Sequence, residues 1–76
     1  MEIQVTLLGA LRDKLPRQNR GQTTVTLAEG ATVADILGQL KLATTTASAI
    51  NGTQIEKSHV LKDGDAVQLF RQLGGG

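Results

Sequence analysis

Apolar residues at every second position begin the chain and predict a β-strand. Ile3, Val5 and Leu7 alternate with polar neighbours, a pattern typical of a strand with one buried face. Residues 11–15 then carry leucines four positions apart, which is enough for about one helical turn. Pro16 disfavours helix in the residue before it, so we expect the turn to end there.

A second alternating segment and an amphipathic helix follow. Residues 17–21 are polar and predict a loop, and residues 23–27 predict a strand with its aliphatic residues inward and its threonines outward. Thr32 and Asp35 are spaced as in a capping box, with Asp in place of the usual Glu or Gln. After them, apolar residues at helical spacing form one face of a predicted helix: Val33, Ile36, Leu37 and Leu40.

The remaining pattern predicts two turns and three strands. Residues 43–47 are small and polar and predict a loose connection. An Asn-Gly pair at residues 51–52 favours a type I′ hairpin, because both residue types tolerate a positive φ. Residues 63–65 predict another turn, and Val67 and Leu69 alternate inward along a final strand. This order predicts an α+β fold, a mixed sheet of about five strands with one main helix packed across it.

The composition limits the function classes that the chain can belong to. Its 76 residues are enough for one domain, which we place at residues 1–71, and the absence of cysteine excludes disulfides, thiolate metal sites and cysteine nucleophiles. Phe70 is the single aromatic residue, which argues against a nucleic-acid partner bound by base stacking. No secretory signal and no bilayer-spanning apolar run is present, so we expect a cytoplasmic protein without a membrane partner.

Side chains suited to catalysis are few. The one histidine, His59, follows Ser58 and has Glu56 and Asp63 nearby in sequence. These residues lie in a polar segment between short strands, where nothing would orient a triad or supply an oxyanion hole, so we interpret them as surface residues. The segment 63–65 lacks the spaced oxygen ligands of a calcium loop, and no metal site is expected.

Four basic residues gather between the first two predicted strands, with Asp13 as the only acid among them. They are Arg12, Lys14, Arg17 and Arg20. Such a cluster is more often a solvated face, but it also suits contact with phosphate or with an acidic partner. The sequence leaves its role open.

Three consecutive glycines end the sequence at residues 74–76. Glycine has no Cβ, so this segment costs folding entropy and adds no packing, and we expect residues 72–76 to form a flexible tail outside the domain. A glycine tail fits a narrow tunnel and leaves its carboxylate open to attack, which suits acyl chemistry on a partner. The alternative is a frayed terminus or a cloning remnant.

Several short motifs resemble the MoaD/ThiS family of sulfur carrier proteins. They are Glu29-Gly30-Ala31-Thr32-Val33 before the helix, Ile50-Asn51-Gly52, and Leu61-Lys62-Asp63-Gly64-Asp65-Ala66-Val67 leading into Leu69-Phe70 and a terminal Gly-Gly. Each motif is weak alone, but they follow the family's order and spacing over nearly the whole chain, so the combination is fairly specific.

This resemblance implies a ubiquitin-like β-grasp fold and a carrier that is not itself an enzyme. An E1-like adenylating enzyme would use ATP to convert the Gly76 carboxylate to an acyl-adenylate, and a sulfur donor would then form a thiocarboxylate. The sulfur would pass to a substrate on the large subunit of molybdopterin synthase or on thiazole synthase. No cofactor would be bound to the chain, which we expect to be monomeric when free.

Within the family, residues 5–15 are most similar to the molybdopterin synthase small subunit, since thiazole-pathway carriers usually have a short hairpin there. The tail departs from that type, which more often has a proline-bearing approach to Ala-Gly-Gly or Ser-Gly-Gly. We therefore expect a role in molybdopterin biosynthesis and keep several alternatives. These are a sulfur carrier for thiamine thiazole synthesis, for tRNA or for cysteine synthesis, a ubiquitin-like protein modifier, and a β-grasp interaction module without tail chemistry.

The resemblance and the glycine tail place the expected reaction site at the carboxyl end. Gly76 is the reacting residue and Gly75 its unhindered neighbour, while Gly74 and Leu73 are expected to thread into the partner. No other residue is assigned to the chemistry itself.

Phe70 is a separate candidate for partner binding. If Val67 and Leu69 face the core, a period of two places Phe70 on the opposite face of the sheet. An exposed aromatic ring beside the tail would be suited to anchor a partner. The alternative is that Leu8 or a loop covers the ring.

Overall fold

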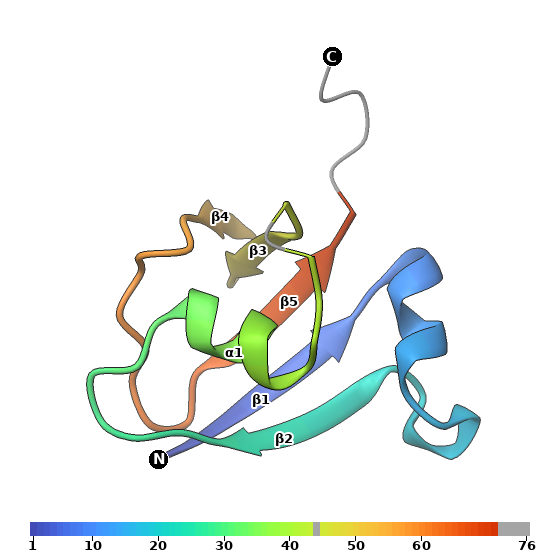
Figure 1. Cartoon of the computed structure of the whole chain (residues 1–76), viewed down its shortest axis with the longest axis horizontal. Coiled ribbons are helices and arrows are strands. Elements are labelled where there is room, and N and C mark those ends of the chain that lie inside the picture. The colour runs from blue at the N-terminus through green and yellow to red at the C-terminus, as the bar shows by residue number, and fades with distance from the viewer. Residues whose placement is uncertain (44, 72–76) are drawn as a thin grey trace.

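The computed structural model describes residues 1–43 and 45–71, and within them the chain forms five strands, one α-helix and two 3-10 turns (Figure 1). In chain order these are β1 (Glu2–Leu7), η1 (Gly9–Lys14), η2 (Arg17–Asn19), β2 (Gln22–Thr26), α1 (Val33–Gln39), β3 (Ala47–Ile50), β4 (Thr53–Ile55) and β5 (Ala66–Phe70). The predicted order of strands and main helix is confirmed.

The strands form one mixed sheet in the order β2-β1-β5-β3-β4, and α1 lies across one of its faces (Figure 1). β1 and β5 are parallel, with Val5 opposite Val67 and Leu7 opposite Leu69. The other neighbouring pairs are antiparallel. The last strand of the chain therefore lies in the middle of the sheet, between β1 and β3.

The core fills the space between α1 and the sheet. Burial alternates along β1 and β5 as the period of two requires. The most deeply buried aliphatic residues are Ile3, Val5, Leu7, Val33, Ile36, Leu37, Val67 and Leu69. Ser48 of β3 is also fully buried, and its hydroxyl donates a hydrogen bond to the Ile55 carbonyl oxygen at 3.3 Å, which compensates for its desolvation.

The capping box and the apolar face of α1 are confirmed. The Thr32 backbone N–H donates to Asp35 Oδ2 at 2.8 Å, which satisfies one of the donors left unpaired at a helix start. Leu40 follows the helix as its C-cap and is half-buried. Gly38 is exposed on the other side of α1, as its position off the apolar face predicts.

The two predicted turns are also confirmed. Asn51 and Gly52 both have positive φ values, 53° and 80°, as a type I′ turn between β3 and β4 requires. At the second turn, Gly64 has a φ of 86° and the Asp65 backbone N–H donates to the Lys62 carbonyl oxygen.

Four local predictions are corrected by the structure. The turn expected at residues 11–15 is a 3-10 turn that starts at Gly9, because so short a segment closes with i to i+3 hydrogen bonds. The predicted loop at 17–21 contains η2. Ala47 belongs to β3, since it pairs with Phe70. Thr23 lies opposite Val5 and shares the inward face of β2, so not every threonine faces outward.

Candidate functional site

The residues expected to react follow the last described residue, Arg71. Outside the described residues lie Gly76, Gly75, Gly74 and Leu73. The structure does describe the strand that leads to them, β5, and the surface around its carboxyl end.

β5 is held by a strand on each side. Its inward residues Val67 and Leu69 are fully buried, and it pairs with β1 and β3. Beyond the end of β1, the Leu8 backbone N–H donates to the Leu69 carbonyl oxygen at 2.9 Å. The strand before the predicted tail is therefore fixed in the sheet, because it is hydrogen-bonded along both edges almost to its end.

The parallel pairing of β1 and β5 brings their carboxyl ends to the same end of the sheet. The connection through η1 and η2 starts there, immediately after β1, and returns there to begin β2 at Gln22. β5 also ends here (Figure 1), and Arg71 follows it in the chain. The basic segment and the carboxyl end of β5 thus lie at the same end of the sheet, although about 50 residues separate Arg20 from Phe70 along the chain.

Phe70 lies on the open face of the sheet, away from α1, as predicted. It is half-buried and alternates with the buried Leu69, and it does not belong to the aliphatic core. Ala47 lies opposite it in register and is 6% exposed. Leu7 and Leu69 lie opposite each other in register. Leu8 follows Leu7 and Phe70 follows Leu69, and Leu8 is 40% exposed. We call Leu8 and Phe70 the apolar patch.

The sequence interpretation missed the contribution of Leu8, which it considered only as a cover for Phe70. The signal was present, because Leu8 continues the period that places alternate residues of β1 on the open face. Its backbone is extended, with φ −106° and ψ 154°. The role of Phe70 as an anchor for a partner stays a prediction.

The residues around the one histidine form an exposed connection between β4 and β5. Ser58, His59, Glu56 and Asp63 are all exposed. Their recorded hydrogen bonds are structural: the His59 carbonyl oxygen accepts from the Val33 backbone N–H, and Asp63 Oδ1 accepts from the Glu2 backbone N–H at 2.8 Å. Within residues 1–43 and 45–71, no group of His, Asp or Glu side chains is placed to hold a metal ion.

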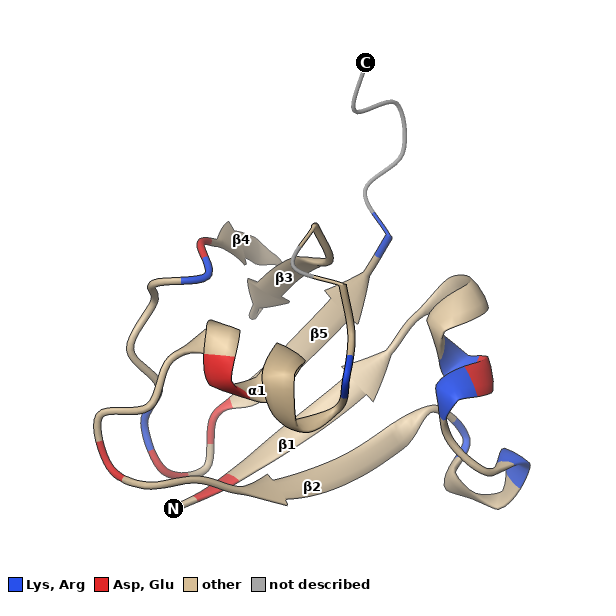
Figure 2. Ribbon diagram, viewed as in Figure 1, with Lys and Arg blue, Asp and Glu red and all other residues tan. Residues whose placement is uncertain are grey.

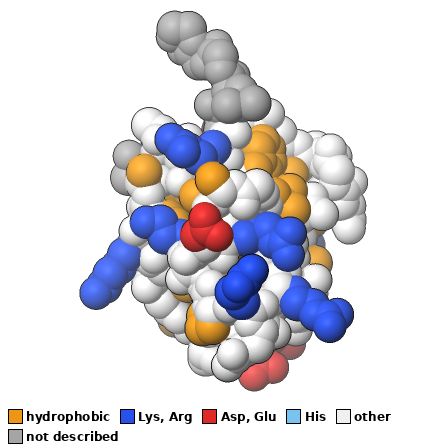
Figure 3. All heavy atoms as spheres, turned by 90° about the vertical axis from the view of Figure 1, so that its right-hand side faces the viewer, with side chains coloured by type: hydrophobic (Ala, Val, Ile, Leu, Met, Phe, Trp, Pro, Cys, Tyr) orange, Lys and Arg blue, Asp and Glu red, His pale blue; other side chains and the backbone are white. Residues whose placement is uncertain are grey.

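Charged residues are unevenly distributed between the two ends of the sheet (Figure 2), with Lys62 beside Asp65 at one end and Asp13 within η1 at the other. Acidic residues gather where β1 and β5 begin and β2 ends: Glu2, Glu29, Asp63 and Asp65. The basic cluster Arg12, Lys14, Arg17 and Arg20 belongs to the opposite end, where β1 and β5 end and Arg71 follows β5. Figure 3 views the molecule from the side of η1 and η2 and shows basic side chains around a single acidic one, beside hydrophobic side chains.

The part of the chain that the structure describes holds no helix of the length and hydropathy needed to cross a membrane.

Comparison with known proteins identifies relatives over nearly the whole chain. A family model described as the ThiS family matches residues 5–76. No curated protein is similar enough in sequence to be matched.

Solved structures with the same fold cover almost all of this chain. Small archaeal modifier protein 1 of Haloferax volcanii is 18% identical over 95% of this chain and 98% of that one, with a TM-score of 0.75. A putative molybdopterin converting factor subunit 1 from Pyrococcus furiosus is 20% identical over 96% and 99%, with a TM-score of 0.68. The thiamine biosynthesis protein ThiS of Geobacter metallireducens is 29% identical over 96% and 99%, with a TM-score of 0.57. The expected ubiquitin-like β-grasp fold is confirmed.

Proposed function

Because the chain belongs to the ThiS family, whose members are small carriers rather than catalysts, we propose that it carries sulfur as a thiocarboxylate on Gly76. The family match carries this proposal, since it extends through the terminal glycines. The position of β5 supports it, because this strand is paired on both sides and fixes the point at which the predicted tail begins.

In the proposed reaction the partner enzyme supplies all catalytic groups. A Gly76 carboxylate oxygen attacks the α-phosphorus of ATP, pyrophosphate leaves, and an acyl-adenylate forms. A sulfide-class donor then attacks the Gly76 carbonyl carbon and AMP leaves, so that a C–S bond replaces the C–O bond to the nucleotide.

We place the carrier in molybdopterin biosynthesis, with thiamine thiazole synthesis as the alternative. The supporting observation is the η1–η2 segment between β1 and β2, where the molybdopterin-type carriers have an extra helical turn. The partners on this proposal are an E1-like adenylating enzyme, a sulfur donor and the large subunit of molybdopterin synthase. Reconstitution of sulfur transfer from this chain, either with the large subunit of molybdopterin synthase or with thiazole synthase, would discriminate the two pathways.

The central test is the conversion of the carboxylate to a thiocarboxylate. With an E1-like adenylating enzyme of the same organism, ATP and sulfide, the intact mass should rise by about 16 Da, the difference between sulfur and oxygen. Deletion of residues 75–76 should abolish this shift with little loss of thermal stability, because terminal residues carry few native contacts. Mass spectrometry of the intact chain provides the measurement.

A pair of glycine substitutions controls for general damage to the protein. Gly75→Ala adds a methyl group next to the reacting carboxylate and should slow the reaction. Gly38→Ala adds the same group in open space on α1, and should leave the reaction unchanged while stabilising the helix by roughly 1 kcal/mol. No mass shift in the wild-type chain would contradict the carrier, and isopeptide adducts with lysines instead would indicate a protein modifier.

A further inference from the structure

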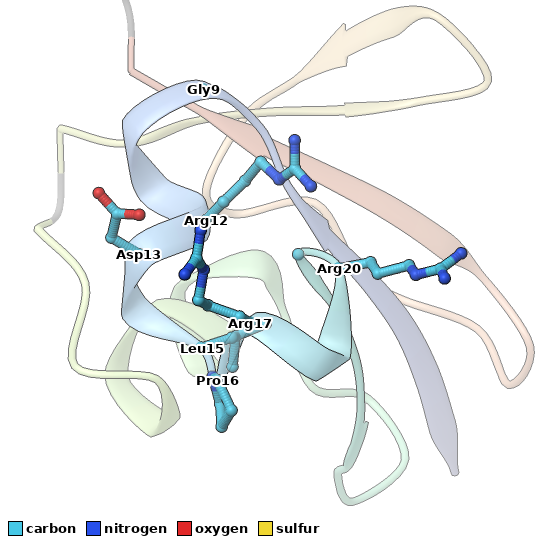
Figure 4. Close-up of a pocket in the computed structure, with 8 residues that line it drawn as sticks. Gly9, Arg12, Asp13, Leu15, Pro16, Arg17 and Arg20 are labelled. Atoms are coloured by element: carbon cyan, nitrogen blue, oxygen red, sulfur yellow. The ribbon is translucent and has the colours of Figure 1, made fainter.

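Three arginines of the basic cluster line a hollow in the surface formed by the two 3-10 turns. The hollow has a volume of about 400 Å³, and Asp13 lines it together with Arg12, Arg17 and Arg20 (Figure 4). Pro16, which separates η1 from η2, also lines it. The two turns fold back on each other around this proline and bring together arginines from both sides of it.

The Arg12 side chain lies close to Gly21. A Cβ added at Gly21 would come within 3.1 Å of Arg12 Cγ and Nε and within 2.8 Å of the Leu7 carbonyl oxygen. Gly21 also has a φ of 76°, which side chains other than glycine rarely adopt. The absence of a side chain at this position therefore lets the aliphatic part of Arg12 lie against the backbone, with its guanidinium outward.

Within residues 1–43 and 45–71, the guanidinium groups of the three arginines remain available to another molecule. Among the described residues, no side-chain hydrogen bond involves Arg12, Arg17 or Arg20. Figure 4 shows the Asp13 carboxylate and the Arg20 guanidinium extending in opposite directions. Each guanidinium presents five N–H donors in a planar fork, which suits carboxylates on another molecule.

The position of the cluster connects it to the reaction site. It lies at the same end of the sheet as Arg71 and the apolar patch, because β1 and β5 are parallel. The acidic residues at the opposite end give the domain a charge asymmetry along the strands, although the net charge is only +1. Such an asymmetry orients a molecule as it approaches a charged surface more than it changes the overall attraction.

We propose that the Arg12, Arg17 and Arg20 surface docks against an acidic surface of the adenylating enzyme and orients the carboxyl end of the chain toward its active site. This inference rests on the proposed function, and names the chemistry by which the partner is recognised. The hollow and the apolar patch would form two parts of one interface: long-range charge attraction selects the orientation, and the aromatic ring then anchors the complex.

The arrangement favours a protein surface over the other polyanions that the cluster suits. The three arginines and Lys14 are all exposed and are spread over two turns, whereas a tight phosphate site would require buried or backbone donors converging on one point. The near-zero net charge and the acidic opposite end weaken attraction to nucleic acid.

The experiment compares two variants with the same change in net charge. Arg17→Gln/Arg20→Gln removes two charges from the hollow, and Lys57→Gln/Lys62→Gln removes two exposed charges from the connection that leads to the start of β5. Association with the adenylating enzyme is measured by stopped-flow fluorescence of a labelled enzyme. At about 0.05 M NaCl, the arginine variant should associate roughly tenfold more slowly than wild type, and the lysine variant less than twofold more slowly.

Salt and product formation complete the test. At about 0.5 M NaCl the variants should converge, because exposed charges are then screened, and at saturating enzyme both should reach the full thiocarboxylate mass shift. Equal slowing by both variants, or none by the arginine variant, would overturn the docking surface while leaving the carrier function intact. Loss of affinity for duplex DNA with unchanged enzyme binding would also overturn it. A wild-type chain that forms no thiocarboxylate would instead refute the proposed function.

Discussion

The two faces of the sheet use the same strands for different purposes. Under α1, the inward residues of β1 and β5 are aliphatic and almost completely buried. On the open face the alternate residues of these strands are polar or exposed, except near the carboxyl end of β5, where Phe70 and Leu8 form the apolar patch. Adjacent residues of β5 therefore differ in role: Leu69 contributes to the stability of the core, and Phe70 to the proposed recognition of a partner.

Leu69 and Phe70 provide the sharpest test of this comparison, because they are adjacent in one strand. Leu69→Ala should lower the free energy of unfolding by about 3 kcal/mol, since it removes a fully buried side chain and leaves a cavity. Urea unfolding followed by circular dichroism measures the loss. A domain of this size has only roughly 4–11 kcal/mol of stability, so the midpoint should fall markedly. A loss below about 1 kcal/mol would mean that the core is less dependent on β5 than its burial indicates.

The helix on the covered face offers an intermediate effect. Asp35→Ala removes the acceptor for the Thr32 backbone N–H and should lower the free energy of unfolding by about 1 kcal/mol. Gln39→Ala is the matched control, because Gln39 is exposed on the same helix, and it should change stability by less than about 0.5 kcal/mol. Thermal unfolding of both variants decides whether the capping box contributes as expected; equal effects would show that it does not.

Phe70→Ala should have the smallest effect on folding and a clear effect on binding. The ring is half-buried on the open face and outside the core, so we expect a stability loss of about 1 kcal/mol or less. Truncation of an aromatic anchor commonly weakens an interface by about 2 kcal/mol, and titration calorimetry with the adenylating enzyme would measure this. Ala66→Ser, a change on the same face at the other end of β5, serves as the control. A large stability loss for Phe70→Ala, with binding unchanged, would contradict the separation of the two faces.

Local sequence was sufficient for the order of the strands and the main helix, and for the start of that helix and the turn of the β3–β4 hairpin. The capping box at Thr32 and Asp35, and the hairpin turn at residues 51–52, depend on residues within a few positions of each other. The alternation in β1 and β5 likewise predicted which side of each strand would be buried. The family motifs predicted the β-grasp fold and membership of this family; the sheet and the solved structures confirm the fold, and the ThiS family match confirms the membership.

Tertiary structure decided how distant segments meet. No local pattern places β5 between β1 and β3, sets its parallel register with β1, or buries the polar Ser48. The same pairing places Leu8 beside Phe70, and the fold of η1 and η2 around Pro16 gathers the arginines at the tail end of the sheet. Periodicity reports which face of a strand is apolar, whereas pairing between strands depends on contacts that the chain makes only when it closes long loops. The sequence alone therefore determined the elements of the chain and its terminal glycines. The tertiary structure determined that the apolar patch and the arginines lie at the end of the sheet where β5 ends.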